Sequence, residues 1–214
     1  MKNIVLALAL TALSSQAFAA DTKSVAGLWY GGVELGYSKV KSDAQSTANN
    51  LVSKVGGSAT VTQDTGVAIG RIFAGYNVNE NLAVELGYIH TSDVSQNAAG
   101  VAGNSVAYTA SANVSVSGVD YSVLLRPSIS SGWNGLFGKI GGHYLEASTD
   151  YTVTGTSTVS GTYNVSGGGF LAGLGYDGSV AENIDFRTSY TYYNSLAGGN
   201  GHANVFSIGI LGKF

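Results

Sequence analysis

Single ionisable residues stand between apolar neighbours in several short alternating segments of this chain. Glu34 lies within 31–37 (Gly-Gly-Val-Glu-Leu-Gly-Tyr), and Glu85 lies within 82–88 (Leu-Ala-Val-Glu-Leu-Gly-Tyr). Successive side chains of a strand point to opposite faces, so one face carries Val, Leu and Tyr while the other carries Gly, Ser and the charge. Charges placed in this way can pair with one another, or they can gate an ion path. Either role requires that the charged face of the strand points into the interior of the protein.

The alternation favours a barrel whose solvent is lipid. A water-soluble barrel has a wetted, polar exterior, and its inner face is shaped for a ligand. A strand that is apolar on one face, with an isolated charge on the other, fits the opposite arrangement of an apolar outside and a polar inside. We therefore expect the charged residues to point into the barrel.

The first residues have the features of an export signal. A basic residue precedes an apolar run over 4–13, and small residues occupy Ala17 and Ala19. This pattern is typical of a secretory signal peptide over residues 1–19, followed by a mature barrel over residues 20–214. The apolar run is too short to cross a bilayer as a helix. Without Cys there is neither a lipid anchor nor a disulfide, so closure of the sheet must supply the stability.

The composition argues against nucleic acid as a partner. Without the basic residue of the signal, the mature chain has 9 basic residues (10 − 1) against 13 acidic ones, a formal charge of −4. Glycine is frequent, at 31 residues, but it follows no collagen period. This fits strands whose backbones approach closely better than it fits disorder. Strand patterning continues without a linker, which indicates one domain.

Eight segments have the alternation of strands. They lie near 28–40, 66–76, 82–90, 118–129, 136–146, 167–176, 184–193 and 203–214. The short connections are 77–81, 130–135 and 177–183, and the other four lie near 41–65, 91–117, 147–166 and 194–202. Short turns at one end and long loops at the other are typical of bacterial outer-membrane barrels. We therefore predict an all-β fold, an eight-stranded antiparallel up-and-down transmembrane β-barrel in the cell outer membrane, with four long extracellular loops.

Alternation within these strands assigns eight ionisable side chains to the interior. They are Glu34, Arg71, Glu85, Asp120, Arg126, Lys139, Asp185 and Arg187. The same assignment turns aliphatic residues outward and gathers aromatic residues near both ends of the span, as interfacial girdles require. Arg71 is the least obvious member, since it takes Val67 and Phe73 inward with it. We keep it inside because a cation at the midplane of the lipid face costs roughly 2–4 kcal/mol.

The chain resembles the OmpA-type eight-stranded outer-membrane β-barrel family. The resemblance rests on Trp-Tyr-Gly-Gly at 29–32, on Asn-Leu-Ala-Val-Glu-Leu-Gly-Tyr at 81–88, on Arg187 and on a final strand that ends in Phe214. The last feature is similar to the signal that the barrel assembly machinery reads. Larger members append a peptidoglycan-binding domain, but this chain stops at Phe214. The resemblance therefore covers the barrel domain only. It further implies outer-membrane lipid and lipopolysaccharide as surroundings, and no cofactor.

The predicted interior set is balanced in charge. An eight-stranded barrel is just wide enough to be filled by side chains. Four acids face four bases, which permits a paired network without a large unpaired remainder. We expect a plug of salt bridges without a continuous pore. The alternative is a small gated conduit for ions or small hydrophobic solutes. A gate carboxylate that family members can carry is not available here, because that position is Gly175.

The histidines are the candidates for enzymatic chemistry, because some outer-membrane barrels are hydrolases or acyltransferases. The nearest local match to a Ser-His-acid site is His90 with Ser92 and Asp93. Neighbouring residues of a strand alternate faces, however, and Ser-rich loops bring such residues together by chance. We therefore expect no enzymatic activity and no metal site.

Two of the long loops have strand character of their own. Residues 97–117 and 150–166 alternate with period 2 and are rich in Thr, Val and Tyr, which predicts hairpins that continue above the membrane. The exposed edge of such a ribbon could add a strand of another protein. Asp150 is their one ionisable residue, so capture of anionic partners by a basic patch is not expected. We expect adhesion to, or association with, a host or neighbouring-cell protein. The alternative is that the loops only shield the barrel mouth.

Overall fold

The computed structural model describes residues 26–39, 58–64, 66–101, 106–127 and 134–214. The predicted signal peptide over 1–19 lies outside the described residues. The elements are β1 (Trp29–Lys39), β2 (Ser58–Gln63), β3 (Gly66–Asn77), β4 (Leu82–Thr91), β5 (Val94–Val101), β6 (Ala107–Leu125), β7 (Leu136–Thr154), β8 (Thr158–Ala181), β9 (Ile184–Asn194), the 3₁₀ helix η2 (Leu196–Gly198) and β10 (His202–Lys213). Within these residues, no helix is long and apolar enough to cross a membrane.

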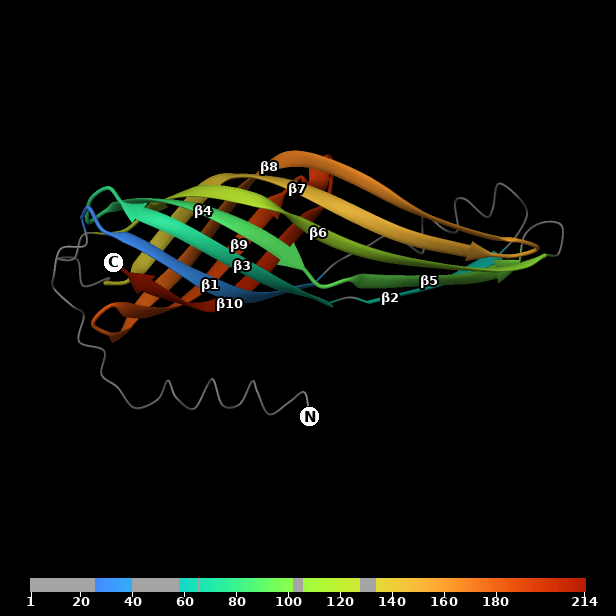
Figure 1. Ribbon diagram of the computed structural model, residues 1–214, viewed down its shortest axis with the longest axis horizontal. Coiled ribbons are helices and arrows are strands. Elements are labelled where there is room, and N and C mark those ends of the chain that lie inside the picture. Colours follow the sequence, from blue (N-terminus) through green and yellow to red (C-terminus); the bar gives the residue numbers. More distant parts are fainter. Residues whose placement is uncertain (1–25, 40–57, 65, 102–105, 128–133) are drawn as a thin grey trace.

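Eight of the strands close into an antiparallel barrel (Figure 1). The order around the barrel is β1, β3, β4, β6, β7, β8, β9 and β10, and β10 pairs again with β1. Each barrel strand pairs with its neighbours along the chain, which makes the topology up-and-down. The predicted fold class is confirmed. We call the end of the barrel with Trp29 and Lys213 the terminal end, and the opposite end the ribbon end.

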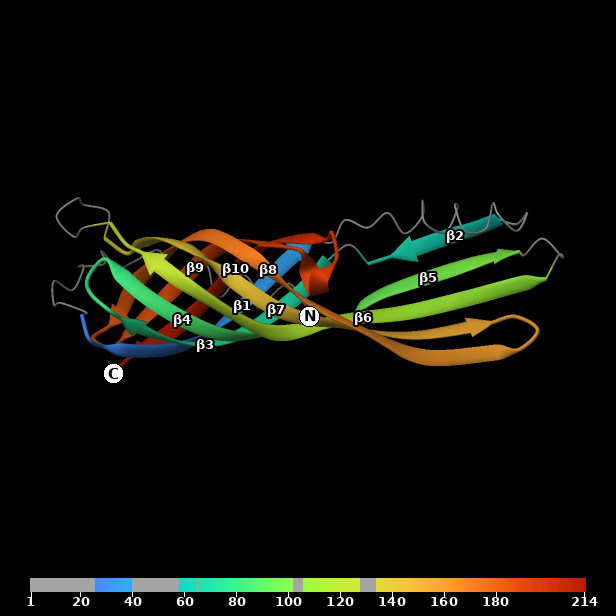
Figure 2. The ribbon, with the colours of Figure 1, turned by 90° about the horizontal axis from the view of Figure 1, so that it is seen from above.

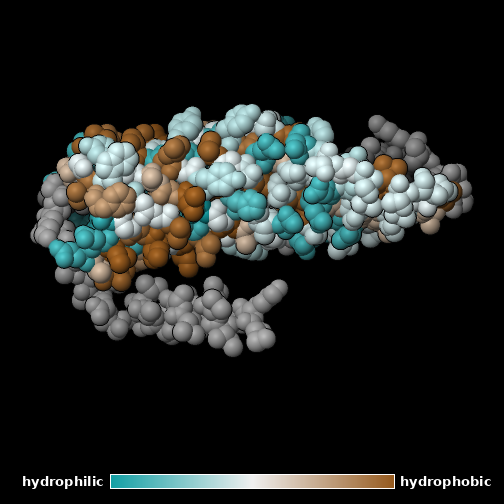
Figure 3. All heavy atoms as spheres, viewed as in Figure 1, coloured by the Kyte–Doolittle hydropathy of each residue, from teal (hydrophilic) through white to brown (hydrophobic). Residues whose placement is uncertain are grey.

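The outside of the barrel is apolar and the inside holds the charges, as the alternation predicts. On β4, Leu86 is 62% exposed whereas its neighbour Glu85 is 4% exposed. Brown, hydrophobic residues gather over the barrel in Figure 3, and the ribbon end is paler and more polar. Aromatic rings pair at the terminal end, where the Trp29 and Tyr76 ring centroids are 5.0 Å apart. Such a surface matches lipid with an interfacial aromatic girdle.

Several strand ends differ from the sequence prediction. The segment predicted as 118–129 ends at Leu125, so that Arg126 follows the strand instead of lying within it. The predicted turn at 177–183 is too long: β8 continues to Ala181 with a register irregularity near its end, and residues 182–183 make the turn to β9. The strand is longer because Asp177 finds partners inside the barrel, as described below. Part of the predicted turn at 130–135 lies outside the described residues.

Strands β6, β7 and β8 continue beyond the barrel as a ribbon (Figure 2). β6 and β7 remain paired up to Thr109 opposite Thr154, and β7 and β8 up to Thr154 opposite Thr158. β5 pairs with the first part of β6, and β2 pairs with β5. The predicted hairpins over 97–117 and 150–166 are therefore present, with 102–105 outside the described residues. We call the sheet formed by β2, β5 and the outer parts of β6, β7 and β8 the ribbon.

Two apolar clusters fill the barrel above and below its middle. The cluster toward the terminal end contains Tyr30, Phe73, Ala83, Leu124, Phe137 and Leu211. The cluster toward the ribbon end contains Ile89, Leu171, Tyr193 and Val205, and Leu196 of η2 packs against it. The 3₁₀ helix thus covers the ribbon end of the interior. Charged side chains occupy the layer between the clusters.

Candidate functional site: the charged layer of the barrel

Arg71 is the centre of the charged layer. Its side chain on β3 donates two parallel hydrogen bonds to Asp120 of β6, from Nε and Nη2, each 2.8 Å long. Its Nη1 donates to Oε2 of Glu34 on β1 at 2.7 Å, and its Nη2 also reaches Oε2 of Glu85 on β4 at 3.2 Å. All four side chains are buried. One guanidinium therefore holds three carboxylates, and the paired fork geometry suits arginine better than lysine.

Arg187 on β9 forms the second half of the layer. Its Nη1 donates to Oε1 of Glu85, so Glu85 bridges the two arginines. Its Nε and Nη2 donate to the two carboxylate oxygens of Asp177 at 2.6 and 2.9 Å. The guanidinium carbon lies 4.8 Å from the ring centroids of both Phe73 and Phe137. The cation is therefore paired on one side and packed against aromatic rings on another.

Hydroxyl groups complete the carboxylates of this layer. Tyr30 donates to Oε1 of Glu85 at 3.0 Å, and Tyr193 donates to Oδ2 of Asp120 at 3.3 Å. Ser189 and Ser207 reach Oε1 of Glu34 at 3.2 and 3.3 Å. Buried charges are tolerated when they are both paired and hydrogen-bonded. The layer meets both conditions at each of these carboxylates.

The structure separates the predicted set into a layer and a rim pair. Lys139 is buried on β7, within electrostatic range of Glu34, Glu85 and Asp120. Asp185 lies apart, where its Oδ2 is 3.0 Å from the Nζ of Lys213 near the terminal end. Arg126, beyond the end of β6, is half-buried and donates to Oδ1 of Asn77 at 2.6 Å.

Asp177 is the functional residue that the sequence analysis missed. It takes the place in the layer that was expected for Asp185, and its Oδ2 also lies 3.5 Å from Nη2 of Arg126. The layer then contains Glu34, Glu85, Asp120 and Asp177 against Arg71, Arg126, Lys139 and Arg187. The available signal was parity, since Asp177 follows Gly173 and Gly175 on the inward face of the same strand.

The histidines have structural surroundings. The Ser92 hydroxyl, part of the nearest match to a hydrolytic site, accepts a hydrogen bond from the Ala68 backbone N–H at 3.1 Å. His90 points to the exposed, outer face of β4. His143 is buried, and its Nε2 donates to the Asn194 carbonyl oxygen at 2.7 Å. In the part of the chain that the structure describes, no group of three or more His, Cys, Asp or Glu residues could hold a metal ion. The absence of enzymatic activity remains a prediction.

A closed antiparallel barrel with a lipid-compatible exterior and an ionic interior defines the class of outer-membrane barrels. The family model for the outer membrane protein beta-barrel domain matches residues 5–214. The chain belongs to this family, and it is accordingly an outer-membrane protein. No curated protein matches the chain significantly.

Solved structures with a similar fold come from several bacteria. Ail, the attachment invasion locus protein of Yersinia pestis, is 12% identical with a TM-score of 0.48, over 88% of this chain and 99% of that one. OprG from Pseudomonas aeruginosa is 15% identical with a TM-score of 0.47, over 88% and 96%. Neisserial surface protein A is 14% identical with a TM-score of 0.40, over 87% and 97%.

Proposed function

We propose that this protein is a surface-interaction protein of the outer membrane, with an interior plugged by paired charges and a ribbon that contacts a host or neighbouring-cell protein. The observation that carries the proposal is the ribbon itself. Strands β6, β7 and β8 run past the barrel without a break in register, and β5 and β2 widen the sheet. A loop that only shielded the mouth would not need to continue the pairing of the barrel strands so far.

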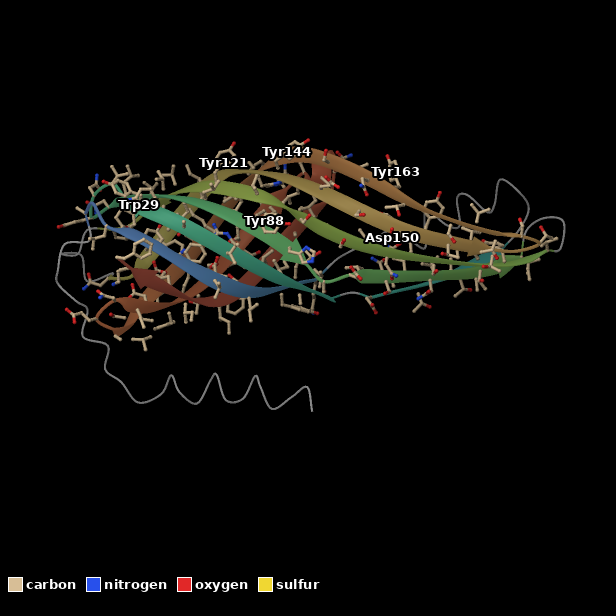
Figure 4. All side chains as sticks on the ribbon, viewed as in Figure 1. Trp29, Tyr88, Tyr121, Tyr144, Asp150 and Tyr163 are labelled. Atoms are coloured by element: carbon tan, nitrogen blue, oxygen red, sulfur yellow. The ribbon has the colours of Figure 1, made fainter. Side chains whose placement is uncertain are left out.

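The polarity of the ribbon supports contact with protein more than with polyanions. Asp150, labelled in Figure 4, is the one charged side chain among the described residues of 97–117 and 150–166. Its Oδ1 accepts a hydrogen bond from the Thr162 hydroxyl at 2.6 Å. Thr, Ser and Asn make up most of the side chains on the face of the ribbon that carries Asp150. A surface of this kind has uncharged hydrogen-bonding groups and strand edges to offer.

Shortening the ribbon tests the proposal. In one variant residues 97–113 are deleted, which leaves Ser95 and Gln96 as a two-residue turn between the paired Val94 and Val114. In a second variant Asn-Gly replaces residues 150–162, which joins the paired Thr149 and Tyr163 through a tight turn. Both variants should reach the surface, because every strand of the barrel itself is kept.

We expect cells that display the doubly shortened protein to bind host cells no better than cells without the protein. The wild type at equal surface display is the matched control, and the two single variants apportion the effect between the hairpins. Undiminished adherence of the doubly shortened protein would overturn the proposed role of the ribbon.

The proposed plug predicts electrical silence. The ion pairs of Arg71 and Arg187 span the middle of the barrel between two apolar clusters, which supports a filled interior. The purified wild-type protein should therefore give no conductance steps in a planar bilayer over a wide voltage range. Reproducible steps from the folded protein would replace the plug with the conduit for ions or small solutes.

The remaining partners follow from the membrane location. Lipid and lipopolysaccharide would contact the apolar exterior, and Phe214 would serve the barrel assembly machinery as a recognition residue. The position of Phe214 supports this, since its backbone N–H and carbonyl oxygen both hydrogen-bond to the backbone of Trp29 where β10 closes on β1, with N–O distances of 2.9 and 3.1 Å. Its side chain is exposed on the outside.

A further inference from the structure

One edge of the ribbon is unpaired among the described residues. Strand β8 pairs with β7 along its whole outer part, but it begins to pair with β9 only at Leu171. Gly167 lies against Gly198 of η2, which covers the edge at that point. The backbone of Thr158–Ser166 therefore offers its outer edge to another strand, over about 30 Å at roughly 3.3 Å per residue.

This edge lacks the features that prevent pairing. Edge strands of soluble proteins commonly carry Lys, Pro or a bulge, which discourage the addition of another strand. The segment Thr-Val-Ser-Gly-Thr-Tyr-Asn-Val-Ser at 158–166 has no charged residue and no proline. Its register against β7 is continuous. Val159, Tyr163 and Val165 lie on one face and are 57%, 61% and 38% exposed. An edge that is long, uncharged and partly apolar favours association.

The segment is complementary to itself in the antiparallel direction. When two copies are aligned with Thr162 opposite Thr162, Val159 meets Val165 and Gly161 meets Tyr163. On the opposite face, small polar residues meet one another. A tyrosine opposite a glycine is a cross-strand pair that this protein already uses, since Tyr121 is opposite Gly142 in the barrel. There the Tyr121 ring fills the space that a Cβ at Gly142 would need.

We infer that the β8 edge over Thr158–Ser166 pairs antiparallel with the same segment of a second copy of this chain on a facing membrane. The direction of the strands places the second copy on a facing membrane. All copies in one membrane have β8 running in the same direction, so their β8 edges could pair only in parallel. Antiparallel pairing needs a copy that points the opposite way. The inference rests on the proposed surface-interaction function and names the partner. A single pair of short edges is weak, but many pairs between two cells add up by multivalency.

Charge complementation tests this register. The variants are Val159→Lys with Val165→Lys, and Val159→Glu with Val165→Glu. In the inferred pair residue 159 of one copy is opposite residue 165 of the other, so each variant places like charges opposite one another twice. The two variants mixed together place opposite charges at the same positions. The assay is the settling of two differently coloured cell populations that display the protein.

Wild-type cells should settle together, and each double variant alone should settle roughly tenfold less, since like charges directly opposite destabilise strand pairs. The mixture of Lys and Glu variants should settle again, in clusters of both colours, which also shows that both variants are folded. A matched control is Thr149→Lys with Val153→Lys on β7, on the same face one strand inward, and it should still settle.

Three results would overturn the inference: wild-type cells that do not settle, double variants that settle as the wild type does, or a mixture that fails to recover. The proposed function itself fails only if wild-type cells neither settle together nor adhere to host cells through the ribbon. If wild-type cells adhere to host cells through the ribbon without settling together, the surface-interaction role stands and the self-pairing is wrong. If they settle together but do not adhere to host cells, the self-pairing stands and the partner is a neighbouring bacterial cell.

Discussion

Arg71→Met should destabilise the barrel by about 3–5 kcal/mol, the range for breaking a buried ion pair by removal of one partner. The substitution removes the cation that bonds Glu34, Glu85 and Asp120 at once. Methionine fills much of the volume, so the loss is one of charge and hydrogen bonds. Among the described residues, Arg187, Lys139 and hydroxyl groups remain near these carboxylates. Urea unfolding of the protein in lipid vesicles, followed by tryptophan fluorescence, measures the change.

Arg126→Met is the matched control for Arg71→Met. Arg126 is half-buried at the terminal end, and its guanidinium lies 3.5 Å from Asp177. Asp177 keeps both hydrogen bonds to Arg187 in this variant. The expected cost is about 1 kcal/mol, because the substitution removes a long ion pair to Asp177 and a hydrogen bond to Asn77, both partly exposed. An equal loss of stability in both variants would show that the layer is not centred on Arg71.

Leu86→Arg should cost roughly 2–4 kcal/mol, the penalty for arginine at the midplane of the lipid face of a barrel. Leu86 lies midway along β4 with its side chain on the apolar exterior. The lipid causes this cost. The outer face of β4, all of which the structure describes, carries no acidic residue that could pair with the new arginine. The same vesicle-unfolding experiment gives the size of the effect.

Val159→Arg is the control, because Val159 is 57% exposed and Leu86 is 62% exposed. We propose that the ribbon, and Val159 with it, lies outside the membrane, so arginine there should change the free energy of unfolding by less than about 0.5 kcal/mol, as on other water-exposed surfaces. Equal costs at the two sites would mean that the barrel exterior and the ribbon face the same solvent.

Alternation was sufficient to predict the faces of the barrel strands. Side chains of a strand alternate between its two faces with a period of 2. Once a single charge such as Glu85 is placed inside, the face of every other residue of that strand is determined. Arg71 shows the strength of the rule. It was placed inside against the hydropathy of Val67 and Phe73, and the structure places all three inside. The cost of a cation in lipid outweighs the loss of an apolar side chain from it.

The ends of strands and the partners across the barrel could not be predicted in this way. Asp177 and Gly178 are residue types that favour turns, so the sequence predicted a turn there. In the structure Asp177 instead accepts two hydrogen bonds from Arg187, which only the closed barrel brings within reach. Glu85 and Arg187 are 102 residues apart in the chain. Their contact depends on the tilt and stagger of the strands, which the pattern of one strand does not contain.

The ribbon was predicted in outline but not in width. The hairpins over 97–117 and 150–166 follow from their alternation, whereas β2 was placed in a long loop. The six residues of β2 are paired with β5, which is not a strand of the barrel. A short strand whose partner is itself an extension of a loop has little local signal, so pairing decides its conformation.

Solvent accessibility of spin labels along one strand tests the central claim most directly, that lipid surrounds the barrel while its charges lie inside. The chain has no Cys, so single cysteines can be introduced and labelled without interference. A label at Leu86→Cys in vesicles should be accessible to oxygen and protected from a water-soluble nickel complex. A label at Val159→Cys should show the reverse. A Leu86 label that collides freely with the nickel complex in the folded protein would contradict the account.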